Sequence, residues 1–291
     1  MQIILNGLIV GSAYALMGIG FSLIYSTVRY FNLAYGMVAV IGAYVAYTLM
    51  NSWSLNYVIA MLAGALVAVL IGMLSSSILF KPMVRRGGSS LVILVASFGL
   101  LIILQNISAL IWQNTTRALS ISDRILPGYN LFGLIITPNQ LMIGAVALLM
   151  MLILELFLKK TRYGMAIRAI GDNQELTKVL GLKTEQIILA VYVIGTFISA
   201  ISATLIALEI GIRPTHGVTL VIKAIIAAII GGLGSIRGAL LGGLLLGVAE
   251  NLGIYFLGGQ WQDTVAFTLL AVFLLVRPEG LFAKKRLVSV N

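Results

Sequence analysis

The sequence contains no cysteine among its 291 residues, and charged residues make up only 10% of it. The absence of cysteine excludes disulfides, thiolate metal sites and cysteine nucleophiles. The single histidine, His216, has no potential metal ligands near it in the sequence, so we predict no metal site. No glycine is followed by lysine, so the phosphate-binding loop of a nucleotide hydrolase is missing. We also find no nucleophile, base and orienting group together, and we expect no enzymatic activity.

The sequence also lacks the alternation of apolar and polar faces that a water-soluble domain of this length needs. Hydrophobic residues make up 60% of it, which indicates that the lipid bilayer is its solvent. The continuous apolar runs exclude the short alternating strands of a membrane β-barrel and predict helices. A spanning helix needs roughly 20 apolar residues. We expect spans near residues 2–27, 33–50, 57–80, 90–112, 138–158, 187–210, 218–232, 238–257 and 263–277. The last three are short, which leaves a re-entrant or broken geometry open for one of them.

The net charge of +10 indicates orientation rather than nucleic-acid binding. With the N-terminus outside, fifteen of the nineteen Lys and Arg residues fall on the cytoplasmic side, as the positive-inside bias requires. We therefore predict an all-α polytopic transmembrane bundle of about eight or nine segments, with the C-terminus in the cytoplasm. We expect a single membrane domain over residues 1–291, with an outer loop at 113–137 and a cytoplasmic loop at 159–186.

The cytoplasmic loop is the longest polar segment, and it holds six of the basic and three of the acidic residues. Asp172 or Asn173 can cap a helix that begins just after Gly171, and Gly181 can end it. This pattern predicts a short amphipathic helix along the membrane face. An ordinary solvated loop is the alternative.

Small residues recur at four-residue spacing in two regions, which predicts two close helix contacts. One face consists of Gly7, Gly11 and Ala15, and the other of Gly234, Gly238 and Gly242.

Three ionisable residues, Glu209, Lys223 and Glu250, lie inside apolar runs, where each needs a partner or water. Arg213 follows Glu209 by four residues, a spacing that allows an ion pair. Lys223 is a conceivable partner for Glu250 across the bundle. A structural buried pair is favoured over a proton relay, because a relay usually needs several such groups in series.

The block from Asn32 to Gly36 places an amide, the Tyr35 phenol and a glycine where a span begins. Asn32 can act as a helix cap beside an interfacial Tyr35. The alternative is a broken helix that faces a translocation path, where irregular backbone is tolerated only if it lines a cavity or is buried in protein.

Three segments, 161–195, 31–36 and 231–250, resemble the branched-chain amino acid ABC transporter permeases of the LivH kind, and the likeness extends across essentially the whole chain. The resemblance implies a subunit of an importer in the bacterial cytoplasmic (inner) membrane, paired with a second related permease. It implies two cytosolic ATPases as the users of ATP, with no cofactor in this chain. A periplasmic binding protein is expected to deliver leucine, isoleucine or valine, and alternating access is the implied mechanism.

By the same resemblance, the residues that match the coupling region, which contacts the ATPase, are Gly171, Asp172, Asn173, Glu175 and Gly181. The sequence has Glu-Leu-Thr at 175–177 where many other importers have Glu-Ala-Ala, a departure that weakens the general ABC signature. The residues expected on the substrate path are Asn32, Tyr35 and Gly36. A permease for urea, short amides or a sugar is one alternative, and a channel or ion-coupled carrier that needs no ATPase is another.

Overall fold

The computed structural model describes residues 1–119, 128–131 and 134–282. Within these ranges, eight helical segments are long and apolar enough to cross a membrane. Six of them are single helices: α1 (Gln2–Val28), α2 (Ala34–Trp53), α5 (Ser90–Trp112), α6 (Pro138–Lys160), α9 (Thr184–Ile210) and α11 (Ile236–Leu257). One runs through α3 (Tyr57–Leu74), a π-helical stretch (Ser75–Phe80) and α4 (Lys81–Arg85). The last joins a 3-10 turn (Gly259–Trp261) to α12 (Gln262–Val276).

The predicted spans therefore agree with the helices to within a few residues. The predicted span at 218–232 corresponds to α10 (His216–Gly231), which has only 16 residues and is shorter than the eight spanning segments. At 1.5 Å per residue it is about 24 Å long, shorter than a hydrocarbon core of ~30 Å. It is one of the three C-terminal segments that the sequence predicted to be short, and the other two are long enough to be span candidates.

Local signals explain where several helices begin. Thr137 and Gln140 form a reciprocal capping box at the start of α6, with Pro138 in the first turn. Ser89 accepts a hydrogen bond from the Val92 amide at the start of α5, and Asn56 caps α3 in the same way. These side chains satisfy amide groups that would otherwise lie unpaired at the helix ends.

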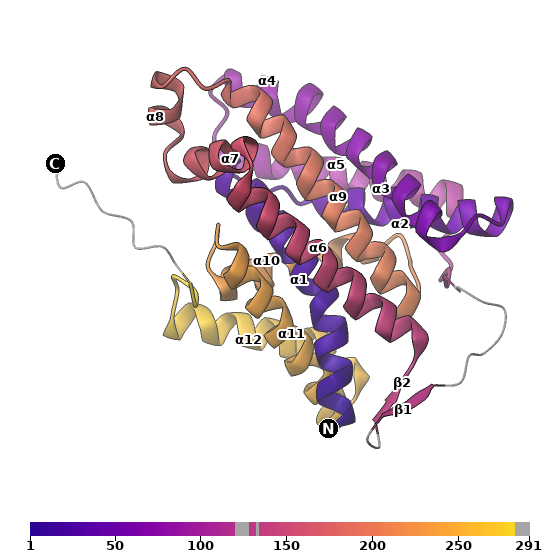
Figure 1. Cartoon of the computed structure of the whole chain (residues 1–291). Coiled ribbons are helices and arrows are strands. Elements are labelled where there is room, and N and C mark those ends of the chain that lie inside the picture. The colour runs from indigo at the N-terminus through magenta and orange to yellow at the C-terminus, as the bar shows by residue number, and fades with distance from the viewer. Residues whose placement is uncertain (120–127, 132–133, 283–291) are drawn as a thin grey trace.

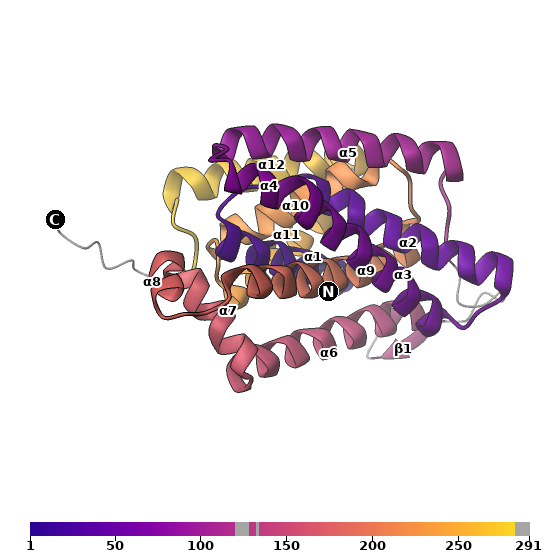
Figure 2. The same ribbon diagram turned by 90° about the horizontal axis from the view of Figure 1, so that it is seen from above.

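Helix α1 lies at the centre of the bundle and packs against α9, α10 and α11, while α2 and α3 pack on the other side of α9 (Figures 1 and 2). In the most apolar 18-residue window of α1, 78% is buried within the protein, compared with 6% in the segment Gly259–Val276. The last segment therefore lies at the periphery, and the core is formed mainly by the helices around α1.

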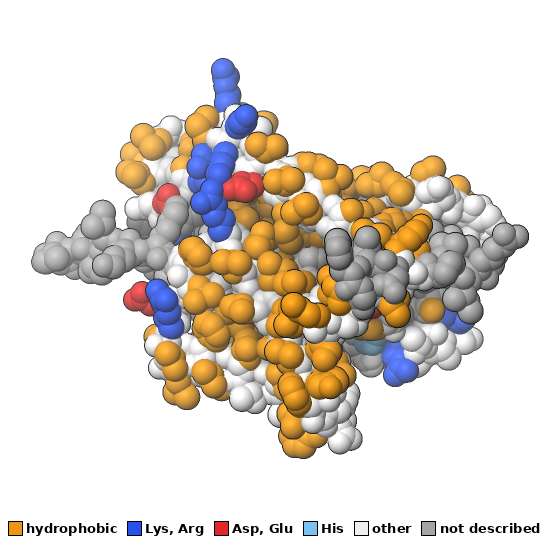
Figure 3. Space-filling view, turned by 60° about the horizontal axis from the view of Figure 1, so that its bottom comes forward, with side chains coloured by type: hydrophobic (Ala, Val, Ile, Leu, Met, Phe, Trp, Pro, Cys, Tyr) orange, Lys and Arg blue, Asp and Glu red, His pale blue; other side chains and the backbone are white. Residues whose placement is uncertain are grey.

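Polar contacts join the connecting segments at two opposite ends of the bundle. At one end the contacts are Arg29 to Gly171, Lys81 and Arg85 to Glu185, and Arg237 to Glu155. At the other end they are Gln2 to Ile135, Gln140 to Glu209, and Arg213 to Thr116. The first end gathers segments that the sequence placed in the cytoplasm. Figure 3 shows Lys and Arg concentrated at that end of a broad hydrophobic surface.

The polar segments are more structured than the sequence predicted. Residues 162–172, expected as a loop, form the helix α7 (Arg162–Asp172), because Ile167 and Ile170 bury one face of it. In the outer segment, β1 (Tyr129–Leu131) and β2 (Leu134–Ile136) form an antiparallel pair that an all-α prediction did not include. The basic residues at 124 and 284–286, which contributed to the predicted orientation, lie outside the described residues.

Glycines allow α1 and α11 to approach closely. A Cβ added at Gly7 would lie 2.7 Å from the Val248 Cα, and one at Gly11 would lie 3.0 Å from the Gly243 carbonyl oxygen. Real side chains do not tolerate the first distance, and the second is tight. The central helix pair therefore depends on residues without side chains.

The second predicted glycine face is only partly a helix contact. Gly238 and Gly242 lie in α11 against the backbone of Gly231 and Ala227 in α10. The prediction that Gly234 shares this face is wrong, because α11 begins only at Ile236. Gly234 has a φ of +89° in the preceding turn, where its amide donates to the Ser22 hydroxyl at 2.9 Å.

We expect Gly11→Leu to lower the free energy of unfolding by at least about 2 kcal/mol, since the added side chain must displace the backbone of α11. Gly144→Leu is the matched control, because nothing lies within 4 Å of a Cβ at this position in α6. The control should stay within about 0.5 kcal/mol of the parent protein. Unfolding in mixed micelles measures both variants, and equal stability of the two would contradict the packing argument.

Candidate functional site

The polar loop at residues 159–186 folds into two helices, α7 and α8 (Gln174–Val179), at the end of the bundle opposite β1 and β2 (Figure 1). The Asn173 Oδ1 accepts a hydrogen bond from the Leu176 amide at 3.1 Å, which stabilises the start of α8. Gly181 has a φ of +75°, and a Cβ there would meet nothing within 4 Å. The chain thus forms the predicted short helix between Asn173 and Gly181, with a left-handed residue after its end.

Helix α8 exposes an apolar face. Leu176 and Val179 in α8, and Leu180 directly after its end, are 56%, 84% and 70% exposed, and their spacing places them on one side. Thr177, which lies off this face, is buried. An exposed apolar cluster of this kind marks a contact surface, either for another protein or for the membrane.

Sequence reasoning missed these three side chains and selected polar and glycine positions instead. The signal was present, because apolar residues at i, i+3 and i+4 within a polar loop mark one helix face. Of the selected residues, Gly171 and Asp172 end α7, and Asn173 lies between the two helices. Glu175 lies in α8, and its side chain is outside the described part of the structure.

The α7–α8 segment is tied to the membrane helices on both sides. On one side, the Arg29 guanidinium at the end of α1 donates to the Gly171 carbonyl oxygen. On the other, Glu185 in the first turn of α9 contacts Lys81 at 2.9 Å and the Arg85 Nε at 3.1 Å. These contacts connect the α7–α8 segment to α1 and, through α9, to α4.

The Asn32–Gly36 block is packed inside the subunit. Tyr35 is 1% exposed and donates to the Met17 carbonyl oxygen at 3.0 Å. Gly36 has no room for a side chain, since a Cβ would lie 2.7 Å from the Val221 Cβ. The expectation of an interfacial tyrosine is therefore wrong.

The capping role expected for Asn32 is wrong as well. The cap of α2 is Leu33, whose amide donates to the Ser97 hydroxyl at 3.1 Å. Asn32 is buried, and its Oδ1 has no partner among the described residues. Neither of the two grooves beside α12 that are described below is lined by Asn32, Tyr35 or Gly36.

Lys223 and Glu250 form a buried ion pair, with the Lys223 Nζ 2.9 Å from the Glu250 Oε2. The Lys223 Nζ is also 3.0 Å from the Tyr14 hydroxyl, and the Gln262 amide donates to the Glu250 Oε2 at 2.8 Å. These contacts join α1, α10, α11 and α12 and compensate two charges that would otherwise be costly inside the membrane.

The other predicted pair, Glu209 with Arg213, does not form. Helix α9 ends at Ile210, and Gly211 has a φ of +75°, so the two residues no longer share a helix face. Glu209 instead accepts from the Gln140 amide at 3.2 Å, and Arg213 donates to the Thr116 hydroxyl. Within the described residues no group of three or more His, Cys, Asp and Glu could hold a metal.

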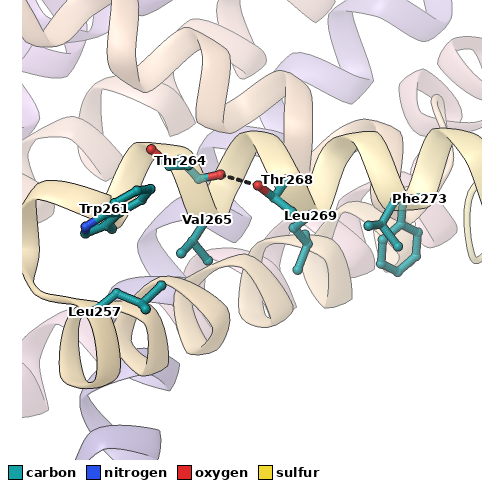
Figure 4. A pocket seen from close by; sticks show the side chains of 8 residues that line it. Leu257, Trp261, Thr264, Val265, Thr268, Leu269 and Phe273 are labelled. Atoms are coloured by element: carbon teal, nitrogen blue, oxygen red, sulfur yellow. Dashed lines mark hydrogen bonds between the residues drawn. The ribbon is translucent and has the colours of Figure 1, made fainter.

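Two grooves flank α12. The larger, about 440 Å³, lies between α11 and α12. Figure 4 shows Leu257 of α11 facing Val265 and Leu269 of α12 in this groove. The Thr268 hydroxyl there donates to the Thr264 carbonyl oxygen at 2.8 Å, and no charged residue lines the groove. The smaller, about 50 Å³, lies between α10 and α12 and is lined by Lys223 and Asp263 among other residues.

Comparison with known proteins agrees with this arrangement. The family described as "Branched-chain amino acid transport system / permease component" matches residues 3–276. The chain is 37% identical to the high-affinity branched-chain amino acid transport system permease protein BraD of Pseudomonas aeruginosa, over 100% of this chain and 98% of BraD. It is 34% identical to LivH of Salmonella typhimurium, over 100% of this chain and 97% of LivH.

Among solved structures, PsaBC from Streptococcus pneumoniae in complex with Fab has a similar fold. The TM-score is 0.53 at 15% identity, covering 96% of this chain and 91% of the other. The family match and the full-length relatives, rather than this distant likeness, decide the assignment. The chain therefore belongs to the permease components of branched-chain amino acid transport systems, which are non-catalytic multi-pass membrane subunits without a cofactor and work with ATPase and binding-protein partners.

Proposed function

We propose that this chain is one of two related permeases in a bacterial importer for leucine, isoleucine and valine. Two cytosolic ATPases drive it, and a periplasmic binding protein delivers the amino acid to its outer face. The N-terminus lies outside, which places α7 and α8 in the cytoplasm. The assignment of the substrate rests on the family and on the full-length likeness to BraD and LivH.

The observation that supports the coupling role is the exposed apolar face of α8. Leu176, Val179 and Leu180 lie at the end of the molecule where the basic residues gather, so water would surround them in the isolated chain. A groove on an ATPase removes them from water, and burial of each such side chain is worth roughly 1.5–3 kcal/mol.

The ATPase therefore binds α8, and closure of the two ATPases displaces this helix. The links from Arg29 to Gly171 and from Glu185 to Lys81 pass the displacement to α1 and α4. The complex has two conformations, and ATP binds one of them more tightly than the other. This difference in affinity is the only means by which ATP can shift the permeases from one conformation to the other.

The function is tested by reconstitution into liposomes. We expect the complete complex, supplied with binding protein and ATP, to accumulate leucine, isoleucine and valine, and the purified chain alone to accumulate none of them. Excess urea or fructose should leave leucine uptake unchanged. Uptake by the chain alone would support an ATPase-independent carrier, and preferential uptake of urea or sugar would overturn the substrate assignment.

A further inference from the structure

The small groove between α10 and α12 combines charged and apolar side chains in one place. Lys223 and Asp263 provide the charges, and Ile222, Ile226 and Phe267 provide apolar surface. Helices α10 and α12 are in contact along this groove, and Figure 2 shows them beside each other on the side of the molecule that also carries α5.

Lys223 and Asp263 can each still make a further polar contact with a ligand. The Lys223 Nζ makes hydrogen bonds to Tyr14 and Glu250, and its distance to the Asp263 Oδ1 is 3.9 Å, too long for a third. The Asp263 side chain is 65% exposed, whereas that of Glu250 is fully buried. Glu250 therefore compensates the charge of Lys223 inside the protein, and Asp263 is available at the surface of the groove.

The buried cluster around Lys223 and Glu250 also contains a polar atom without a hydrogen-bond partner. The Glu250 Oε1 is buried and has no hydrogen-bond partner among the described residues. A buried carboxylate oxygen without a donor is costly, so the cluster can still accept a hydrogen bond from a donor such as an ammonium group.

We infer that this groove receives the zwitterionic head group of a free α-amino acid, with its carboxylate at Lys223 and its ammonium group at Asp263. The inference rests on the proposed function, since it supplies a place on this chain for the transported amino acid. The cavity of about 50 Å³ has room for a few non-hydrogen atoms. The branched side chain therefore lies outside it, on Ile222 and Phe267.

The alternatives in this chain fit an amino acid less well. The groove of about 440 Å³ between α11 and α12 has no charged lining residue. Tyr35 is enclosed by α1 and α9. The α10–α12 groove also lies at the start of α12 and along the middle of α10, which in the proposed orientation is towards the outer side, where the binding protein releases its cargo.

The test uses the complete complex in liposomes and photoleucine, a diazirine analogue of leucine, as the probe. In the parent complex we expect light to attach photoleucine to peptides of α10 and α12 of this chain. Both leucine and 4-methylpentanoate, which lacks the amino group, are added as competitors. Leucine should suppress the labelling at a concentration at least tenfold lower than the concentration of 4-methylpentanoate that has the same effect.

Asp263→Asn should reduce the labelling at least tenfold and abolish the preference for leucine over 4-methylpentanoate, because the ammonium group loses its counter-charge. ATP hydrolysis stimulated by the loaded binding protein should remain. The matched control is Glu209→Gln, which neutralises another exposed acid at the same end of the bundle but outside the groove, and it should behave like the parent. The double variant Lys223→Gln with Glu250→Gln keeps the buried cluster neutral, and it should also lose labelling.

Labelling of other helices, or an Asp263→Asn complex indistinguishable from the control, overturns the inference while leucine uptake by the parent complex stays intact. If the parent complex takes up no branched-chain amino acid at all, the proposed function itself fails.

Discussion

Val179→Asp is expected to abolish stable association with the ATPase and to reduce leucine uptake at least tenfold, while the protein still inserts into the membrane. Val179 is 84% exposed on α8, so an acid at this position costs the isolated fold little. In the complex, the carboxylate would replace an apolar contact and lose its hydration, at a cost of several kcal/mol. Each 1.4 kcal/mol corresponds to a tenfold loss of affinity.

Co-purification of the ATPase and uptake by reconstituted complexes measure this effect. Arg86→Asp is the control, since Arg86 is an exposed residue after α4 at the same end of the bundle but not on α8. It should retain ATPase binding and uptake within about twofold. Normal uptake by Val179→Asp at normal expression would remove the basis for assigning α8 to the ATPase contact.

Glu250→Leu is expected to lower the free energy of unfolding by about 3–5 kcal/mol, because it leaves the ammonium group of Lys223 buried without its counter-charge. Lys223→Met should cost about as much for the same reason. The double variant should recover most of the loss, since it removes both charges and fills the space with apolar side chains. Unfolding of the purified protein in mixed micelles provides the four free energies of the double-mutant cycle.

The exposed pair of Lys159 and Glu155 is the control for this cycle. Its atoms approach to 2.6 Å, closer than in the buried pair, but both side chains stay in contact with water. Lys159→Met should therefore cost less than about 1 kcal/mol. Additive losses in the Lys223 and Glu250 cycle would show that the two charges are compensated by other groups.

The membrane helices could be predicted from the sequence because their signal is local. Residues 90–112 form an apolar run between polar turns, and the helix α5 has the same bounds. The short α10 was also visible, because the number of apolar residues limits the length of a span.

Predictions that depended on a residue's neighbours were less successful. Glu209 and Arg213 have the spacing of an ion pair, but a left-handed Gly211 separates them and each found another partner. Tyr35 lies near the start of a span and was expected at the membrane interface, but packing of α1 and α9 encloses it, and its place on the substrate path stays a prediction. Spacing along the chain could not reveal either outcome, since both depend on which helices meet.

The sequence by itself determined that the chain crosses the membrane several times as helices and that a short helix follows Asn173. Both follow from hydrophobicity, capping and backbone preferences within a few residues. Only the tertiary structure decided that α8 turns Leu176, Val179 and Leu180 outward and that Lys223 lies between Glu250 and Asp263. The first arrangement depends on which face of α8 packs against the bundle. The second joins residues from separate helices, and the cost of burying charge determines it.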